Sequence, residues 1–135
     1  MNGNTKIKIQ KNAINSLKRA IDKHKKINPS SFDDIETSRD SLIKRFEYSF
    51  DLTWKYIKTY LKTIYGIDTA SPKKVFRESA VQKLATKQET DKLIDMVDDR
   101  NLTSHTYNEN LANEVCSSIP GYYKLMSELV EKAKE

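Results

Sequence analysis

Several residue types that characterise other protein classes are scarce in this 135-residue chain. The single cysteine, Cys116, excludes an internal disulfide and a cysteine-based metal cluster. Glycine and proline occur three times each, and this scarcity of turn residues favours helices over an all-β fold. No apolar run approaches the roughly 18 residues of a membrane span. Residues 1–10 are polar and basic, unlike a signal peptide, so we expect a cytoplasmic protein.

Charge, in contrast, is abundant and unevenly distributed. Charged residues make up 32% of the chain, and the net charge is +5. Residues 1–30 contain eight basic side chains and one acidic side chain, so this segment carries the positive charge. A basic segment suits a protein that meets RNA or an acidic partner. A solvated helix face would have the same composition, so charge alone does not decide between these interpretations.

Apolar residues recur at helical spacing through most of the sequence, so we expect an all-α fold with one domain over residues 1–135. Helices are expected over about 6–26, 38–65, 72–84, 88–100 and from 106 onward. Loops are expected at 28–31 and at the acidic stretch 33–36. Because the connections are short, the helices should form a four- to five-helix up-and-down bundle.

The last helix carries three local signals. Thr106 and Glu109 have the spacing of a capping box, in which two side chains satisfy backbone donors reciprocally. Pro120 should bend the helix, because proline removes one of its backbone hydrogen bonds. Cys116 lies at helical spacing between apolar residues, so we expect a small buried side chain.

The segment 98–107 gathers most of the chain's reactive side chains, including Arg100, Asn101, His105 and Tyr107. On a straight helix, residues five apart differ by about 140° in direction, so Arg100 and His105 would not share a face. A helix boundary between them, or a second subunit, would let the two groups meet.

These residue types suit cleavage of a phosphodiester. We expect His105 to lie beside a helix N-terminus, where the helix dipole disfavours imidazolium and attracts phosphate. A neutral imidazole could act as a general base toward a ribose 2′-hydroxyl, while Arg100 held the phosphate. Alternatively, Arg100 pairs with a neighbouring aspartate, Asp98 or Asp99, and His105 caps a helix.

The pattern Arg100-Asn101-x-x-x-His105-x-Tyr107 resembles the Arg-x4-His motif of HEPN ribonucleases. Residues 45–55 are similar to the second-helix segment of one HEPN subfamily, and residues 71–72 and 75–80 also fit its pattern. This subfamily is often labelled nucleotidyltransferase substrate-binding protein, and its genes neighbour a minimal nucleotidyltransferase. The resemblance covers about residues 10–130. Members often carry tryptophan just before the Met-x-x-x-Arg stretch, whereas this chain has the residues 93–95, Leu-Ile-Asp.

The resemblance implies the toxin of a HEPN/minimal nucleotidyltransferase toxin–antitoxin pair. Such a toxin is an endoribonuclease that needs no metal or cofactor and acts as a symmetric homodimer on its RNA substrate. His105 would be the base or acid, Arg100 the phosphate ligand and Asn101 the polar orienter. The nucleotidyltransferase antitoxin would silence it by transferring AMP to Tyr107. The alternative is a non-catalytic subunit that presents a nucleotide or another substrate to a nucleotidyltransferase.

Overall fold

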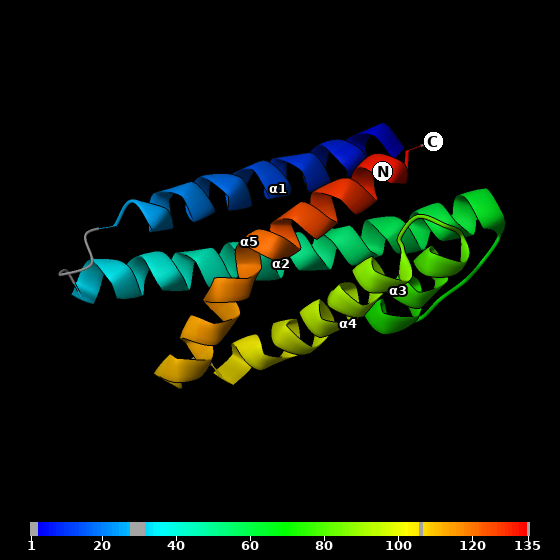
Figure 1. Ribbon diagram of the computed structural model, residues 1–135. Coiled ribbons are helices and arrows are strands. Elements are labelled where there is room, and N and C mark those ends of the chain that lie inside the picture. Colours follow the sequence, from blue (N-terminus) through cyan, green and yellow to red (C-terminus); the bar gives the residue numbers. More distant parts are fainter. Residues whose placement is uncertain (1–2, 28–31, 106, 135) are drawn as a thin grey trace.

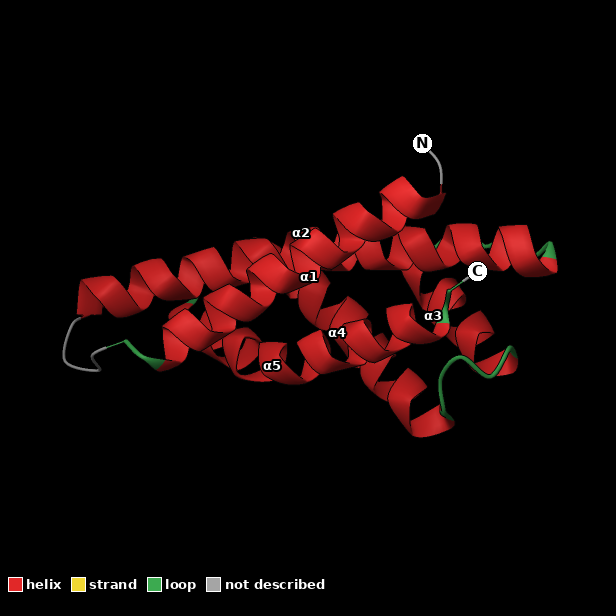
Figure 2. Cartoon of the chain, turned by 90° about the horizontal axis from the view of Figure 1, so that it is seen from above, coloured by secondary structure: helices red, strands yellow, loops and turns green. Residues whose placement is uncertain are grey.

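The computed structural model describes residues 3–27, 32–105 and 107–134, and these residues form helices and short connections without a strand (Figures 1 and 2). The elements are α1 (Gly3–Lys25), α2 (Phe32–Tyr65), α3 (Pro72–Val81), α4 (Lys87–Leu102), the 3₁₀ helix η1 (Thr103–His105) and α5 (Glu109–Lys132). The predicted all-α fold is therefore confirmed.

The longest helix, α2, is the element around which the others are arranged. It contacts α1, α3 and α5, while α4 packs on α3 and α5. Figure 1 shows α1 running antiparallel beside α2, and α5 returning along the bundle toward the end where α1 begins. Both chain termini consequently lie at the same end of the molecule.

The core is built from the apolar faces that helical spacing predicted. On α2, Phe46 and Ile57 are fully buried, and Phe50 is 3% exposed. The ring of Phe46 stacks on that of Tyr122 from α5, with centroids 5.7 Å apart. On α5 the buried side chains continue along the helix with the spacing that the sequence predicted. They include Val115, Ile119, Met126 and Leu129.

Polar contacts inside this core fix α1 against α2. The amide Nε2 of Gln10 donates to Thr53 Oγ1 at 3.0 Å, and both side chains are buried. The hydroxyl of Ser49 donates to the carbonyl oxygen of Ala13 at 3.2 Å. Because a buried polar group is costly without a partner, these bonds favour one register of the two helices.

The N-terminus of α2 differs from the sequence-based expectation. The acidic stretch 33–36 was expected to be a loop, but α2 begins at Phe32 and includes it. Asp33 and Asp34 lie in the first helical turn, where a negative side chain is stabilised by the positive end of the helix dipole. The expected break at 28–31 lies outside the described residues.

The helix boundaries around the candidate segment also differ from the expectation. A complete capping box, which the sequence analysis did not identify, joins Thr86 and Glu89 at the start of α4. The start of α5 is capped by Asn108, whose Oδ1 accepts from the backbone N–H of Leu111 at 3.2 Å. Thr106, the expected cap, lies outside the described residues. The last helix therefore begins at Glu109.

The interior of α5 contains Pro120, which was expected to bend the helix, and Cys116, which was expected to be buried. Pro120 lies inside the helix, and Figure 1 shows the helix axis changing direction between its N-terminal and C-terminal halves. Cys116 is buried, and burial raises the pKa of its thiol to about 11, so the thiol stays protonated at neutral pH. None of the described helices is both long and apolar enough to cross a membrane.

Candidate functional site

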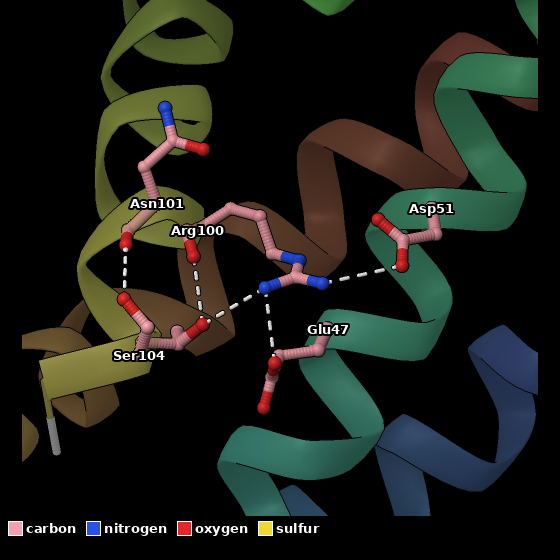
Figure 3. A network of polar contacts seen from close by, with 6 residues as sticks. Glu47, Asp51, Arg100, Asn101 and Ser104 are labelled. Carbon is pink, nitrogen blue, oxygen red and sulfur yellow. Dashed lines mark hydrogen bonds and ion pairs between the residues drawn. The ribbon is translucent and has the colours of Figure 1, made fainter.

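Arg100 lies in the last turn of α4 and reaches across to α2 (Figure 3). Its Nη1 donates to Glu47 Oε2 at 2.9 Å, and its Nη2 donates to Asp51 Oδ2 at 3.2 Å. We call Glu47 and Asp51 the carboxylate clamp. The clamp residues are one helical turn apart, so both carboxylates project from the same face of α2. The side chain of Arg100 is 25% exposed in this arrangement.

The turn that follows Arg100 holds the same guanidinium from its other side. Thr103 Oγ1 accepts from Arg100 Nη1 at 3.0 Å and donates to the carbonyl oxygen of Arg100 at 2.7 Å. Ser104 Oγ donates in the same way to the carbonyl oxygen of Asn101 at 3.1 Å (Figure 3). Both hydroxyls reinforce the end of α4, where the carbonyl oxygen of Arg100 also accepts from the backbone N–H of Thr103. Thr103 thereby ties the geometry of η1 to the position of the guanidinium.

The aspartates that precede Arg100 have other partners. Asp98 forms an ion pair with Lys73 of α3 at 2.7 Å. Asp99 accepts a short hydrogen bond from the hydroxyl of Tyr122. Burial, together with this hydrogen bond, raises the pKa of Tyr122 above that of a free phenol. The alternative in which Arg100 pairs with Asp98 or Asp99 is therefore wrong, and its ion-pair partners are on α2.

His105 and Tyr107 form a second group beyond η1. His105 is the last residue of η1, and its imidazole is exposed. The hydroxyl of Tyr107 is 3.5 Å from His105 Nδ1, at the long limit of a hydrogen bond, and the two rings are nearly perpendicular. Tyr107 is 85% exposed. His105 precedes the cap of α5, Asn108, whose backbone N–H donates to the carbonyl oxygen of His105 at 3.0 Å.

The structure thus separates the predicted site residues into two groups within one chain. The guanidinium of Arg100 contacts the carboxylate clamp, whereas the imidazole of His105 contacts Tyr107. Among the described residues no bond joins Arg100 to His105. Asn101 is exposed, and in Figure 3 its amide lies apart from the guanidinium of Arg100.

A buried arginine near Tyr107 was missed by the sequence analysis. Arg39 of α2 is only 7% exposed and lines a hollow of about 360 Å³. We call this cavity the Tyr107 hollow. Its lining residues are Phe32, Glu36, Arg39, Asp40, Tyr107 and Glu109. One signal was available in the sequence: Arg39 is seven residues before Phe46 and therefore lies on the apolar face of the same helix.

The comparisons with known proteins agree with this fold. The profile of the family described as "Nucleotidyltransferase substrate binding protein like" matches residues 5–135. The chain belongs to this family. No curated protein matches the sequence.

Several solved structures have the same fold. A Thermus thermophilus protein is 34% identical, with a TM-score of 0.82 over 93% of this chain and 99% of that chain. A Haemophilus influenzae protein, described as the substrate binding domain of a nucleotidyltransferase, is 22% identical with a TM-score of 0.81, covering 96% and 99%. A toxin–antitoxin crystal structure with AMP-PNP contains a chain with 21% identity and a TM-score of 0.71, covering 99% and 100%.

The contacts of Arg100 lead to a stability prediction. Replacing Arg100 with alanine should lower the free energy of unfolding by about 1–2 kcal/mol, because two carboxylates and a hydroxyl lose a partly buried charged donor. Urea denaturation followed by circular dichroism measures this loss. Lys73→Ala is the matched control, since it removes a more exposed ion pair and should cost less than about 0.5 kcal/mol. Equal losses for the two variants would contradict a bridging role for Arg100.

Proposed function

We propose that the chain is the cytoplasmic, single-domain toxin of a HEPN/minimal nucleotidyltransferase pair, and that it cleaves RNA without a metal ion. Arg100, His105 and Asn101 are its catalytic residues. The observation that carries the proposal is the exposed imidazole of His105 within the Arg-x4-His pattern. Packing does not explain this histidine, because its ring contacts the exposed ring of Tyr107 rather than the core. The fold shared with a chain of a toxin–antitoxin structure is consistent with the proposal.

The chemistry requires the ribose 2′-hydroxyl of the substrate as the nucleophile. His105 takes the proton of the 2′-hydroxyl while the 2′-oxygen bonds to phosphorus, and the bond from phosphorus to the 5′-oxygen breaks. The departing 5′-oxygen receives a proton from an imidazolium, giving a 2′,3′-cyclic phosphate and a 5′-hydroxyl. Arg100 stabilises the charge on the phosphate oxygens.

A basic groove on the surface of the bundle supports RNA as the substrate class. The groove has a volume of about 570 Å³ and lies between α1 and α2. Lys44 and Arg45 contribute positive charge to it, and Tyr48 contributes an aromatic ring that is 57% exposed. Basic residues that follow a phosphate backbone, together with a ring on which a base can stack, are typical of single-stranded RNA binding.

The catalytic assignment predicts that two substitutions in the motif abolish most RNA cleavage. His105→Ala and Arg100→Lys should each reduce RNA cleavage by about two orders of magnitude or more, because one lacks the base and the other lacks the planar donor fork. Cleavage of a labelled RNA by the purified proteins, and growth inhibition on expression, provide the measurements. Arg100→Lys keeps a cation near the clamp, so it separates catalysis from stability better than alanine.

Two outcomes would contradict the catalytic assignment. One is a His105→Ala protein that cleaves RNA as fast as the unaltered chain. The other is strong inhibition of the unaltered protein by a chelator, which would indicate a metal-dependent reaction. Arg77→Lys, an exposed position on α3 away from the motif, is the matched control and should leave the rate unchanged.

We further propose that the active form is a symmetric homodimer in which two motifs line one cleft. The carboxylate clamp offsets the charge of Arg100 within a single chain, and His105 does not contact Arg100 there. Two-fold symmetry would place two guanidinium groups and two imidazoles around one phosphodiester. Sedimentation equilibrium should give twice the mass of the chain, and mixtures of the inactive Arg100→Lys and His105→Ala proteins should form heterodimers. A monomer that cleaves RNA at full rate would contradict this proposal.

The silencing of this toxin is proposed to act through Tyr107. The phenol of Tyr107 is exposed and 3.5 Å from His105 Nδ1. An AMP group on this oxygen would occupy the space beside the imidazole that an RNA phosphate needs, and would add negative charge there. The geometry therefore favours obstruction at His105 over competition for Arg100, which is bound to the clamp.

Co-expression with the cognate nucleotidyltransferase should add one or more AMP groups to Tyr107 and remove toxicity. Intact-mass spectrometry and peptide mapping detect the added mass and its position. Tyr107→Phe should escape modification and remain toxic in the presence of the partner, while Tyr48→Phe, another exposed tyrosine, should still be modified at Tyr107. A neutralised sample that contains only unmodified Tyr107 would contradict modification and favour inhibition by binding.

The second candidate is a non-catalytic subunit that presents nucleotide or another substrate to a nucleotidyltransferase. The carboxylate clamp favours it, because a structural role for Arg100 accounts for the motif arginine without catalysis. It leaves the exposed His105 without a role. Toxicity of the unaltered chain, lost in His105→Ala, distinguishes the ribonuclease from this candidate.

A further inference from the structure

We propose that the Tyr107 hollow is a binding subsite for a nucleoside monophosphate, with Arg39 as phosphate ligand and Phe32 as the surface on which the base stacks. The inference rests on the proposed function only where it concerns AMP attached to Tyr107. The subsite itself is a property of the unmodified chain and can be tested alone.

Arg39 is a buried cation with too few hydrogen-bond acceptors. Among the described residues its guanidinium makes one hydrogen bond, from Nη1 to Asn113 Oδ1 at 3.3 Å. Its ion pairs with Asp40 and Glu109 are 3.6 and 3.7 Å long, beyond good hydrogen-bond distance. The Nε atom is buried and has no hydrogen-bond partner among the described residues. A buried charged donor in this state is costly, and a phosphate oxygen in the hollow would satisfy it.

Arg100 provides the contrast within the same molecule. Its Nε, like that of Arg39, has no hydrogen-bond partner among the described residues, but its two Nη atoms donate three hydrogen bonds between 2.9 and 3.2 Å. Arg39 is more deeply buried than Arg100 and donates one hydrogen bond. The unused capacity for an anion is therefore larger at Arg39 than at the motif arginine.

The position of the hollow also favours a phosphate. It lies between the first turns of α2 and α5, which contribute Phe32 and Glu109 respectively. The N-terminus of the 24-residue α5 carries a partial positive charge, and Tyr107 lies immediately before the capping residue Asn108. The volume of about 360 Å³ falls within the range of small-ligand sites, about 300–1,000 Å³.

Of the three carboxylates that line the hollow, Glu36 forms no ion pair with Arg39 among the described residues, and the two that do pair with it do not prevent anion binding. The side chains of Asp40 and Glu109 are each 59% exposed, whereas that of Arg39 is 8% exposed. Solvent screens charges that are exposed more strongly than charges that are buried. The repulsion between these carboxylates and a bound phosphate is therefore weakened more than the attraction between Arg39 and the phosphate. Both carboxylates can turn toward solvent and leave Arg39 to the phosphate. Carboxylates also accept hydrogen bonds from ribose hydroxyls and from the amino group of adenine.

Two exposed rings complete the subsite. Phe32 is 61% exposed and Tyr107 is 85% exposed, although aromatic rings are ordinarily buried in a core. A base can stack on the face of Phe32 while its phosphate lies at Arg39. A nucleotide covalently attached to Tyr107 would have a local concentration on the order of millimolar, so weak intrinsic affinity is enough to hold it in the hollow.

The experiment uses AMP and the purified, unmodified chain. AMP should bind with a dissociation constant on the order of 1 mM, the local concentration that a tether supplies. Amide chemical shifts followed by NMR should change around Phe32 and Glu109. Adenosine, which lacks the phosphate, and inorganic phosphate, which lacks the base, should each bind at least about fivefold more weakly.

Two of three substitutions in the hollow should weaken AMP binding, and the third should strengthen it. Arg39→Lys should weaken AMP binding about fivefold or more, because a point charge replaces the donor fork. Asp40→Asn should strengthen it about two- to fivefold, since a competitor for Arg39 loses its charge. Phe32→Ala should weaken binding of AMP but leave that of inorganic phosphate unchanged. Arg19→Lys on the exposed surface of α1 is the matched control and should have no effect.

The results separate this inference from the proposed function. Absence of AMP binding, or binding that Arg39→Lys and Asp40→Asn leave unchanged, overturns the subsite whether or not the protein cleaves RNA. If Arg39→Lys does not fold, the two exposed positions, Phe32 and Asp40, carry the test. An inactive protein that binds AMP with the expected signs overturns the ribonuclease and leaves the subsite in place.

Discussion

The burial of one face of α2 is the interaction on which the rest of the structure depends. Phe46, Phe50 and Ile57 fix this helix against α1, α3 and α5, and Phe46 stacks on Tyr122. The same packing sets the direction of the neighbouring face, about 100° around the helix, and hence the place of the carboxylate clamp that binds Arg100. It also holds Arg39 beneath the Tyr107 hollow, near the other end of the helix. One long amphipathic helix therefore positions Arg39 and the partners of Arg100, the two arginines to which we assign functional roles.

Arg100 and Arg39 differ in how completely their charges are paired, and this difference cannot be inferred from residue type or from membership of a motif. The motif arginine is surrounded by acceptors, so its charge is largely offset in the single chain. Arg39 lies outside the motif, yet its charge is less completely paired and is better shielded from solvent. Anion affinity follows from the unfilled hydrogen-bond capacity and burial of a guanidinium, and not from its membership of a motif.

Local pattern was enough to predict five helices, the buried face of α2 and the burial of Cys116, because these depend on the spacing of neighbouring residues. The helical start of α2 was missed, since acidic residues in a first turn resemble a polar loop in composition. The partners of Arg100 could not be found in this way. Glu47 and Asp51 are about fifty residues away in sequence, and only the packing of α2 brings them to α4. Arg39 was detectable as a charge on an apolar face, but its paucity of acceptors is visible only in three dimensions.

The exposure of Tyr107 determines when the proposed transfer of AMP to it could take place. A side chain that is 85% exposed beside the cap of α5 needs no local unfolding to enter another enzyme's active site. A partner that acts on this phenol can therefore act on chains that have already folded and accumulated, and is not restricted to newly made ones. If the proposed modification occurs, a cell could keep a standing pool of folded protein, and the supply of its active form would depend on removal of AMP from Tyr107 rather than on fresh synthesis.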